Sequence, residues 1–409
     1  MSSRSSFFFL ILLLALSFVL RSPLLFLVAA LSLMVAGSSA LWGRYCLAGV
    51  TYERRLSAAR LLCGEEADLW VEIVNAKPLP LVWLKTEDEV PVELQVQKLE
   101  LGYASKPNRR MLSNLFSMRW YERVRRHYRF IATQRGVYEF GPVRISSGDI
   151  FGFRSRNMQL TGPQIVLVYP KVVPLEDAAL QAARPLGESR TLRRVVADPL
   201  RLAGTRDYQP GDSIRHLHWK ATAHRGALQT KMFEPSASHQ LVLFLNNQTR
   251  ERAYEGVIGD LYETVIVVAA SVARAALEAR HPVGLYTNGS VRDSERRLRL
   301  PPSRHTAQTT RILEALAQLT FFTLMPFEKL LQLEARQLPF GATVIAVSAL
   351  VNEPILSALL DLQATGHPVS LIAVGTGALP PLPPELPVYS AVENWTVMQS
   401  IRLQPARVL

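Results

Sequence analysis

The sequence predicts a multidomain protein with three parts: an N-terminal transmembrane helical hairpin, a β-sandwich module of immunoglobulin-like kind and an α/β domain. Three observations support this fold class. A chain of 409 residues is too long for one ordinary core. Its longest apolar runs lie before residue 43, and short strand-like runs with Gly and Pro turns follow. Strands then alternate with helices. The predicted boundaries are 1–48, 49–185, 186–235 and 236–409, where 186–235 joins the two domains.

The first part contains two apolar runs, residues 7–20 and 24–42, separated by Arg21-Ser-Pro. A helix rises about 1.5 Å per residue and needs roughly 20 residues to cross a bilayer, with about 17 as the lower limit. We therefore expect a tight hairpin of membrane helices. The alternative is a signal peptide cleaved near Ser38-Ser-Ala40, which the long apolar run 7–20 disfavours.

Basic residues flank the predicted hairpin on both sides. They are Arg4 before it and Arg44, Arg54, Arg55 and Arg60 after it. The positive-inside tendency then predicts an inner (cytoplasmic) membrane protein whose soluble domains lie on the cytoplasmic side. The cysteine content agrees weakly with a reducing compartment, because Cys46 and Cys63 are too few for a disulfide framework.

The second part reads as a β-rich module. Strand-like runs separated by Gly and Pro turns occur at 69–75, 81–84, 128–133, 136–145 and 164–169. Several short strands with such turns favour a small sandwich of immunoglobulin-like kind.

A basic stretch interrupts this module. Residues 106–135 contain nine Lys and Arg residues and a single acidic residue, Glu122, although the whole chain has a net charge of only +12. One interpretation is a short amphipathic element on anionic lipid, and its candidate contacts are Arg119, Trp120, Arg123, Arg125 and Arg126. The other interpretation, which we favour, is a loop and a strand whose arginines face water. Nucleic acid is not expected as a partner, because nothing here resembles a nucleic-acid-binding fold.

The third part alternates strands with helices. The predicted strands are 240–245, 283–287, 342–348 and 369–374, and the predicted helices are 261–279, 306–319, 327–337 and 353–364. This rhythm favours a parallel sheet covered by helices on both faces.

The densest polar segment of the chain runs from Thr205 to Gly226 and is followed by residues 228–234. Pro210-Gly-Asp212 has the composition of a tight turn. Residues 213–223 could form a strand, which would place His216, His218 and Lys220 on one face.

The Gly-Asp212, Arg215 and His218-Trp-Lys-Ala residues of this segment resemble the signature of the bacterial family called domain of unknown function 58. The resemblance extends to Arg135-Gly-Val-Tyr-Glu-Phe-Gly-Pro-Val, Phe151-Gly-Phe and Val168-Tyr-Pro-Lys-Val, and covers roughly the whole chain beyond the membrane segment. One departure is Ser147-Gly-Asp-Ile-Phe-Gly, where the family would have an Asp-Pro-Phe-Gly core. The resemblance implies a von Willebrand factor A-like C-terminal domain. It also implies an AAA+ ATPase of the MoxR class as partner, because such an ATPase is often encoded beside family members.

Domains of that type often bind a divalent ion through Asp-x-Ser-x-Ser and a later Asp, since a hard cation needs carboxylate oxygens. Here the corresponding strand ends carry only Asn246, Asn247, Thr249 and Ser348, and Arg250 adds a positive charge. The sequence therefore predicts a vestigial metal site and no cofactor.

Two functions remain open for the signature. In the first, Asp212, Arg215, His218, Trp219 and Lys220 are structural and fix the joint between the domains. The protein is then a membrane-anchored, non-enzymatic scaffold or adaptor that serves the ATPase in assembling or remodelling envelope complexes. In the second, His216, His218 and Asp212 hold zinc in a metal-dependent hydrolase. The sequence has no nucleophile elbow and no phosphate-binding loop of the Gly-Lys-Ser kind, so we favour the first function.

Overall fold

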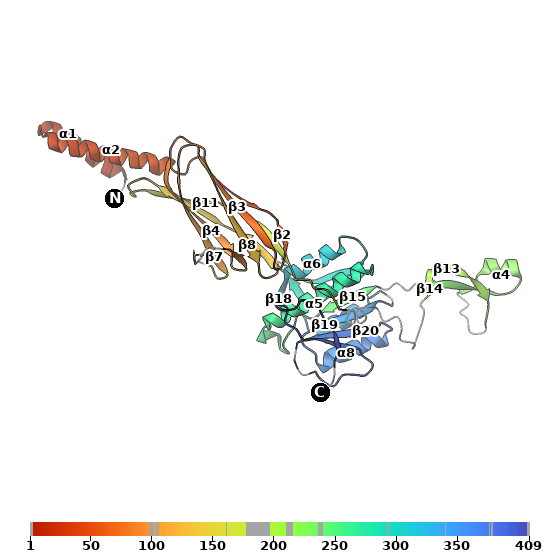
Figure 1. Ribbon diagram of the computed structural model, residues 1–409. Coiled ribbons are helices and arrows are strands. Elements are labelled where there is room, and N and C mark those ends of the chain that lie inside the picture. Colours follow the sequence, from red (N-terminus) through yellow and green to blue (C-terminus); the bar gives the residue numbers. More distant parts are fainter. Residues whose placement is uncertain are drawn as a thin grey trace. The chain divides into compact units, whose positions relative to one another are not determined.

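The computed structural model forms two compact units, Met1–Tyr169 and Pro170–Leu409, which are described separately (Figure 1). The structure describes residues 3–97, 102–103, 106–160, 162–176, 197–209, 216–235, 240–292, 294–339, 341–375, 377 and 379–406. The predicted domain boundaries stay predictions.

The N-terminal helical hairpin is confirmed. Helix α1 (Ser3–Val19) and helix α2 (Pro23–Tyr45) are joined by a short turn in which Arg21 has a φ of 46°. Pro23 begins α2, where its missing N–H costs no hydrogen bond. Most large apolar side chains of both helices are exposed. By length and composition α2 could cross a membrane, and a signal sequence would pass the same test; the apolar part of α1, Phe7–Val19, is shorter.

The rest of the first unit is β-sandwich-like, in agreement with the prediction. One sheet has the order β1 (Val50–Leu56), β3 (Glu66–Asn75), β8 (Arg123–Ala132), β5 (Leu94–Val96). A second has the order β11 (Ser155–Leu160), β10 (Val143–Gly148), β4 (Leu81–Pro91), β7 (Arg109–Met118), β6 (Gly102–Tyr103). A third small sheet has the order β2 (Arg60–Leu62), β12 (Gln164–Tyr169), β9 (Gly136–Phe140).

Alternation along the strands supplies the sandwich core. In β3, Leu69, Val71 and Ile73 are buried, because successive side chains point to opposite faces. The single run predicted over 136–145 is wrong: it is divided into β9 and β10 at Gly141-Pro142, where Gly141 has a φ of 95° and Pro142 has no N–H to donate.

The second unit contains a mixed sheet whose centre is parallel. Its order is β17 (Ser294–Ser303), β16 (Val283–Val291), β15 (Leu241–Leu245), β19 (Thr343–Ser348), β20 (Val369–Val374), β21 (Val388–Ala391), β22 (Gln404–Pro405). Strands β16, β15, β19 and β20 run parallel, as predicted, and β21, which was not predicted, continues the parallel part. The antiparallel strands β17, β22 and β18 (Leu319–Thr323), which pairs with β16, were not predicted.

Helices cover both faces of this sheet, which confirms the second half of the prediction (Figure 1). Leu241, Leu243 and Leu245 of β15 pack in one core with α5 (Gly259–Glu278) and α6 (Gln308–Gln318). Val242 and Phe244 pack in the opposite core with α7 (Phe327–Ala335) and α8 (Glu353–Ala364). All five side chains of β15 are therefore apolar, since both faces of the strand are buried.

Candidate functional site

The signature folds as a β-hairpin that carries a helix. Strand β13 (Ala197–Asp207) pairs antiparallel with β14 (Gln229–Pro235), and α4 (Trp219–Arg225) lies between them in the chain. The strand predicted over 213–223 is therefore wrong over residues 219–223, which are helical. His216, His218 and Lys220 do not share a strand face, because the helix begins between the second and the third of them.

His218 is the residue that starts this helix. It occupies the N-cap position, and its Nδ1 accepts a hydrogen bond of 3.0 Å from the backbone N–H of Ala221. This bond satisfies one of the N–H groups that a helix leaves free in its first turn. At the other end Gly226 has a φ of 70°, a conformation that glycine adopts readily, and closes the helix. The imidazole of His218 thus has a structural role here.

Gln229 connects α4 to both strands, and sequence reasoning missed it. It is fully buried, and its side-chain amide donates to Asp207 Oδ1 at 2.5 Å. Its backbone N–H donates to Thr222 Oγ1, and its backbone carbonyl accepts from His218 N at 2.7 Å. Its place in the sequence gave no sign of this role, because its partners come from β13 and from α4 with its N-cap.

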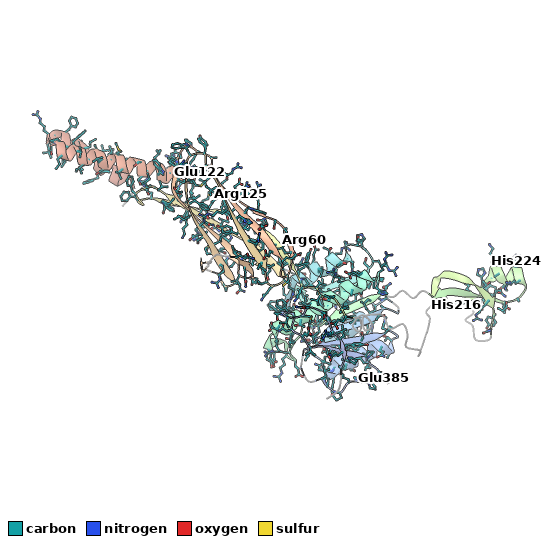
Figure 2. The ribbon with its side chains drawn as sticks, viewed as in Figure 1. Arg60, Glu122, Arg125, His216, His224 and Glu385 are labelled. Atoms are coloured by element: carbon teal, nitrogen blue, oxygen red, sulfur yellow. The ribbon has the colours of Figure 1, made fainter. Side chains whose placement is uncertain are left out.

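The remaining signature residues divide into exposed and undescribed ones. Trp219 is 67% exposed, and Lys220 is exposed beside it. His216 precedes α4 and His224 lies in its last turn (Figure 2). Asp212 and Arg215 lie outside the described residues, so the predicted contacts of these two side chains stay predictions.

A second polar cluster lies at the carboxyl ends of the parallel strands β15 and β19, next to Asn288 within β16. Its side chains are those of Asn246, Asn247, Asn288 and Ser348, all completely buried. Asn246 Nδ2 donates to Ser348 Oγ at 2.9 Å, and Asn288 Nδ2 donates to Asn246 Oδ1 at 3.1 Å. Asn288 Oδ1 accepts from the backbone N–H of Asn247 at 2.7 Å. We call these four residues the amide cluster.

The amide cluster includes three of the four residues predicted for a vestigial metal site. The fourth, Thr249, lies nearby and accepts from the N–H of Ile258 at 2.7 Å. Asn288, which sequence reasoning missed, links the others. All four residues of the cluster are neutral, and Asn246 Oδ1 accepts two hydrogen bonds within the protein. These oxygens are therefore poor ligands for Mg²⁺, which prefers carboxylates.

The basic stretch forms strands β7 and β8 and the turn between them. Arg125 donates to Glu72 Oε2 at 2.6 Å, and Arg123 lies 3.4 Å from the same carboxylate. The hydrogen bond from Arg125 lowers the pKa of Glu72 below its usual value. Arg126 bonds Asn114 at 2.6 Å on the opposite face. Lipid contact at these residues stays a prediction.

The family comparison bears on the signature. Residues 204–374 match the model of the family described as "Protein of unknown function DUF58". This segment belongs to the DUF58 family. The predicted resemblance is confirmed over these residues, which contain α4, β14 and the whole amide cluster. The helical hairpin and the basic stretch lie outside the match.

One curated relative of this chain is the uncharacterized protein YeaD of Bacillus subtilis (strain 168). It is 26% identical over 250 residues, which cover 61% of this chain and 58% of that protein. The aligned region thus spans little more than half of the relative's length.

Solved structures similar to this chain match about a third of it. One is the CARDB domain of a Pyrococcus furiosus protein in complex with di-metal ions, with 13% identity, a TM-score of 0.20 and coverage of 29% of this chain and 91% of that one. Another is a non-cellulosomal cohesin from Archaeoglobus fulgidus, with 15% identity, a TM-score of 0.19 and coverage of 30% and 91%. Because these TM-scores are low, the β-sandwich description depends on the strand pairing itself.

Proposed function

We propose that the protein is a membrane-anchored, non-enzymatic scaffold or adaptor that presents the DUF58 segment to a partner protein. The observation that carries this proposal is the arrangement at the start of α4. The imidazole of His218 caps the helix, whereas the indole of Trp219 beside it is 67% exposed. A signature whose histidine is structural and whose tryptophan faces outward suits binding, because exposed Trp side chains are enriched at interaction hot spots.

The partner proposed here is an AAA+ ATPase of the MoxR class, as the family resemblance implies. Lys220, His224 and Arg225 lie on the same short helix as Trp219 and would favour an acidic partner surface. The client would be an envelope complex that the ATPase assembles or remodels.

Anchoring by α1 and α2 is the second element of the proposal. Helix α2 continues without a break through the Ser38-Ser-Ala40 segment to Tyr45, and the next residues, Cys46 and Leu47, belong to the sandwich core. A signal peptide would be removed, whereas this helix continues directly into folded structure, so we favour an anchor. The positive-inside tendency supports an inner-membrane location with both units in the cytoplasm.

The finer fold assignments also belong to this proposal. We assign the sandwich to the immunoglobulin-like kind because two antiparallel sheets enclose one core. We assign the second unit to the von Willebrand factor A-like kind because helices cover both faces of a largely parallel sheet. The polar cluster at the strand ends corresponds to the place where such domains often bind metal.

The metal-dependent hydrolase with His216, His218 and Asp212 is the competing prediction. In the N-cap arrangement Nδ1 of His218 accepts a hydrogen bond, so neutral imidazole carries its proton on Nε2 and offers no free lone pair to zinc. Zinc binding would therefore require this cap to open.

A binding measurement with the full-length protein in detergent tests the proposal. We expect Trp219→Ala to weaken binding to a purified MoxR-class ATPase by at least about 30-fold, as for a hot-spot residue. The control is Tyr254→Ala, which removes another exposed aromatic side chain (79%) of the DUF58 segment and should bind normally.

Two results would contradict the proposal. One is equal binding, or none, by wild type and both variants. The other is near-stoichiometric zinc in the purified protein that disappears in His218→Ala, which would favour the hydrolase.

A further inference from the structure

Two turns at one end of the sandwich expose large apolar side chains. The turn between β7 and β8 exposes Trp120 (64%) and Tyr121, and the turn between β10 and β11 exposes Ile150, Phe151 and Phe153 (72%). We call residues 119–123 and 149–156 together the membrane rim. An ordinary protein surface exposes large apolar side chains singly, whereas these two adjacent turns together expose five.

The β10–β11 turn lies beside the last turns of α2. A Cβ atom added at Gly43 would come within 2.9 Å of the Arg154 Cβ, so these two residues are in close contact. Arg156 Nη1 donates to the backbone carbonyl of Arg44 at 3.0 Å, and Cys46 Sγ lies 3.7 Å from the carbonyl oxygen of Ser147.

Lys77 links the β7–β8 turn to the C-terminal end of α2. The backbone N–H of Tyr121 donates to the Lys77 carbonyl at 3.2 Å, and Lys77 Nζ donates to the Cys46 carbonyl at 2.7 Å. In Figure 2, Glu122 lies at the end of the sandwich next to α2 and Arg60 lies at the opposite end. Both turns are therefore placed where α2 leaves its apolar stretch.

The C-terminal end of α2 carries the residue types that are typical of a membrane–water interface. Trp42 donates its indole N–H to the carbonyl of Pro80 at 3.1 Å, and Arg44 follows as the first charged residue after the apolar run. Trp and Tyr side chains are enriched at this depth of membrane proteins. The aromatic side chains of the membrane rim thus stand at the depth where a bilayer would accommodate them.

The charges around the rim favour an anionic surface. Residues 44–49, 76–83, 119–123 and 149–156 contain six Arg and Lys residues and two acidic residues, Glu122 and Asp149. The two carboxylates accept backbone hydrogen bonds inside their own turns: Glu122 Oε2 from Arg119 N, and Asp149 Oδ1 from Arg154 N at 2.8 Å. These bonds hold the turns in shape, so little conformational entropy is lost when the exposed tips are buried.

We propose that the membrane rim inserts its aromatic tips into the headgroup region of the bilayer that α2 crosses, and that its arginines select anionic phospholipid. The occupant is a lipid surface, because the rim is continuous with the apolar helix and combines aromatic with cationic side chains. This inference rests on the anchoring proposed above. Arg125, which lies on β8 beyond the rim, pairs with Glu72 at 2.6 Å. We therefore assign the lipid contact to the turn residues and not to the middle of β8.

Photo-crosslinking of the full-length protein in nanodiscs tests this inference. Benzoylphenylalanine is placed at the rim in Trp120→benzoylphenylalanine and Phe153→benzoylphenylalanine. The control is Ile165→benzoylphenylalanine, an exposed site (57%) on β12. Ile165 pairs with Glu139 of β9. Two residues further along, the N–H of Gly141 donates to the carbonyl of Glu89. Glu89 lies eight residues along β4 from Leu81, which is at the α2 end of the strand. At about 3.3 Å per strand residue the control lies roughly 25 Å from the α2 end.

We expect lipid adducts at both rim sites at a yield at least roughly tenfold above the control. Replacing part of the phosphatidylcholine with phosphatidylglycerol should raise the adduct yield at residue 120 by about fivefold, the effect of one arginine near the headgroups.

Extraction of the same nanodisc protein with alkaline carbonate separates the two proposals. If the chain resists extraction but the rim sites form no lipid adducts, the rim inference fails and the anchor stands. If the rim sites crosslink to protein in place of lipid, the rim binds a partner protein and the inference also fails. If carbonate releases the chain, the anchor fails, and the rim inference fails with it.

Discussion

A buried polar cluster of the first unit can be compared with the amide cluster of the second, and the two differ in charge. In the first unit the cluster is ionic: Arg54 Nη1 lies 2.8 Å from Asp88 Oδ1, and Tyr52 donates its hydroxyl to Asp88 Oδ2 at 2.8 Å. In the second unit the amide cluster contains no charged group. Both clusters are almost entirely buried, so the contrast between them is one of charge and not of exposure.

The comparison shows two ways of satisfying polar groups in a core. The ionic cluster joins β1 to β4, and Arg54 also donates to the carbonyls of Phe140 and Gly162, so a single side chain connects three segments. The amide cluster joins three parallel strands at one edge. A buried ionised side chain is stable only beside an opposite charge, whereas a buried amide needs only hydrogen bonds of good geometry. Substitutions and pH should therefore affect the two units differently.

The largest expected effect follows from removing the arginine of the ionic cluster. Arg54→Leu leaves the carboxylate of Asp88 buried without its counter-charge, which typically costs about 3–5 kcal/mol. Hydrogen exchange of peptides from the first unit, in the full-length protein, measures this loss. The control Arg55→Leu removes a neighbouring arginine whose pair with Glu53 is exposed on both sides, and it should leave exchange nearly unchanged. Equal effects of the two variants would contradict the role assigned to Arg54.

A smaller effect is expected in the amide cluster. Asn288→Ala removes the acceptor of the Asn247 N–H and a donor to Asn246, and each buried group left unsatisfied costs about 1–3 kcal/mol. The hydrogen-exchange rate of peptides from β15, β16 and β19 should rise, while peptides from the first unit serve as an internal control. Unchanged protection of these strands would show that the cluster contributes little to stability.

Much of the second unit could be predicted because its strands and helices are buried on a regular pattern. The strand Val369–Val374 and the helix Glu353–Ala364 have the bounds that the sequence indicates. The signature was harder, because α4 depends on contacts that no periodicity records. His218 is an unusual N-cap, and Gln229 is buried only because Thr222, Asp207 and the His218 backbone surround it.

The position of the amide cluster could be predicted from the sequence, but its hydrogen-bond network could not. Asn246, Asn247 and Ser348 were placed together because the family resemblance implies an ion site at the ends of these two strands. Asn288 lies within β16 and was overlooked, since no motif points to it. The Arg54–Asp88 pair was not predicted either, because its partners lie 34 residues apart on strands of different sheets.

The smallest expected effect is a pH dependence that arises from the ionic cluster of the first unit. Burial raises the pKa of Asp88 to about 6 from 3.8, although Arg54 and the Tyr52 hydroxyl oppose this shift. Between these two values the folded state binds a proton that the unfolded state has lost, so the contribution of Asp88 to stability falls as pH rises.

The stability of wild type relative to Asp88→Asn should therefore decrease by about 1 kcal/mol between pH 5 and pH 6, since one pKa unit corresponds to about 1.4 kcal/mol. The difference between wild type and Asn288→Ala in the second unit should stay constant over the same range, because amides do not titrate there. Hydrogen exchange at both pH values, corrected for the intrinsic rate, measures both differences in one protein. A pH-dependent difference for Asn288→Ala, or a constant one for Asp88→Asn, would remove the distinction between an ionic and a neutral core cluster.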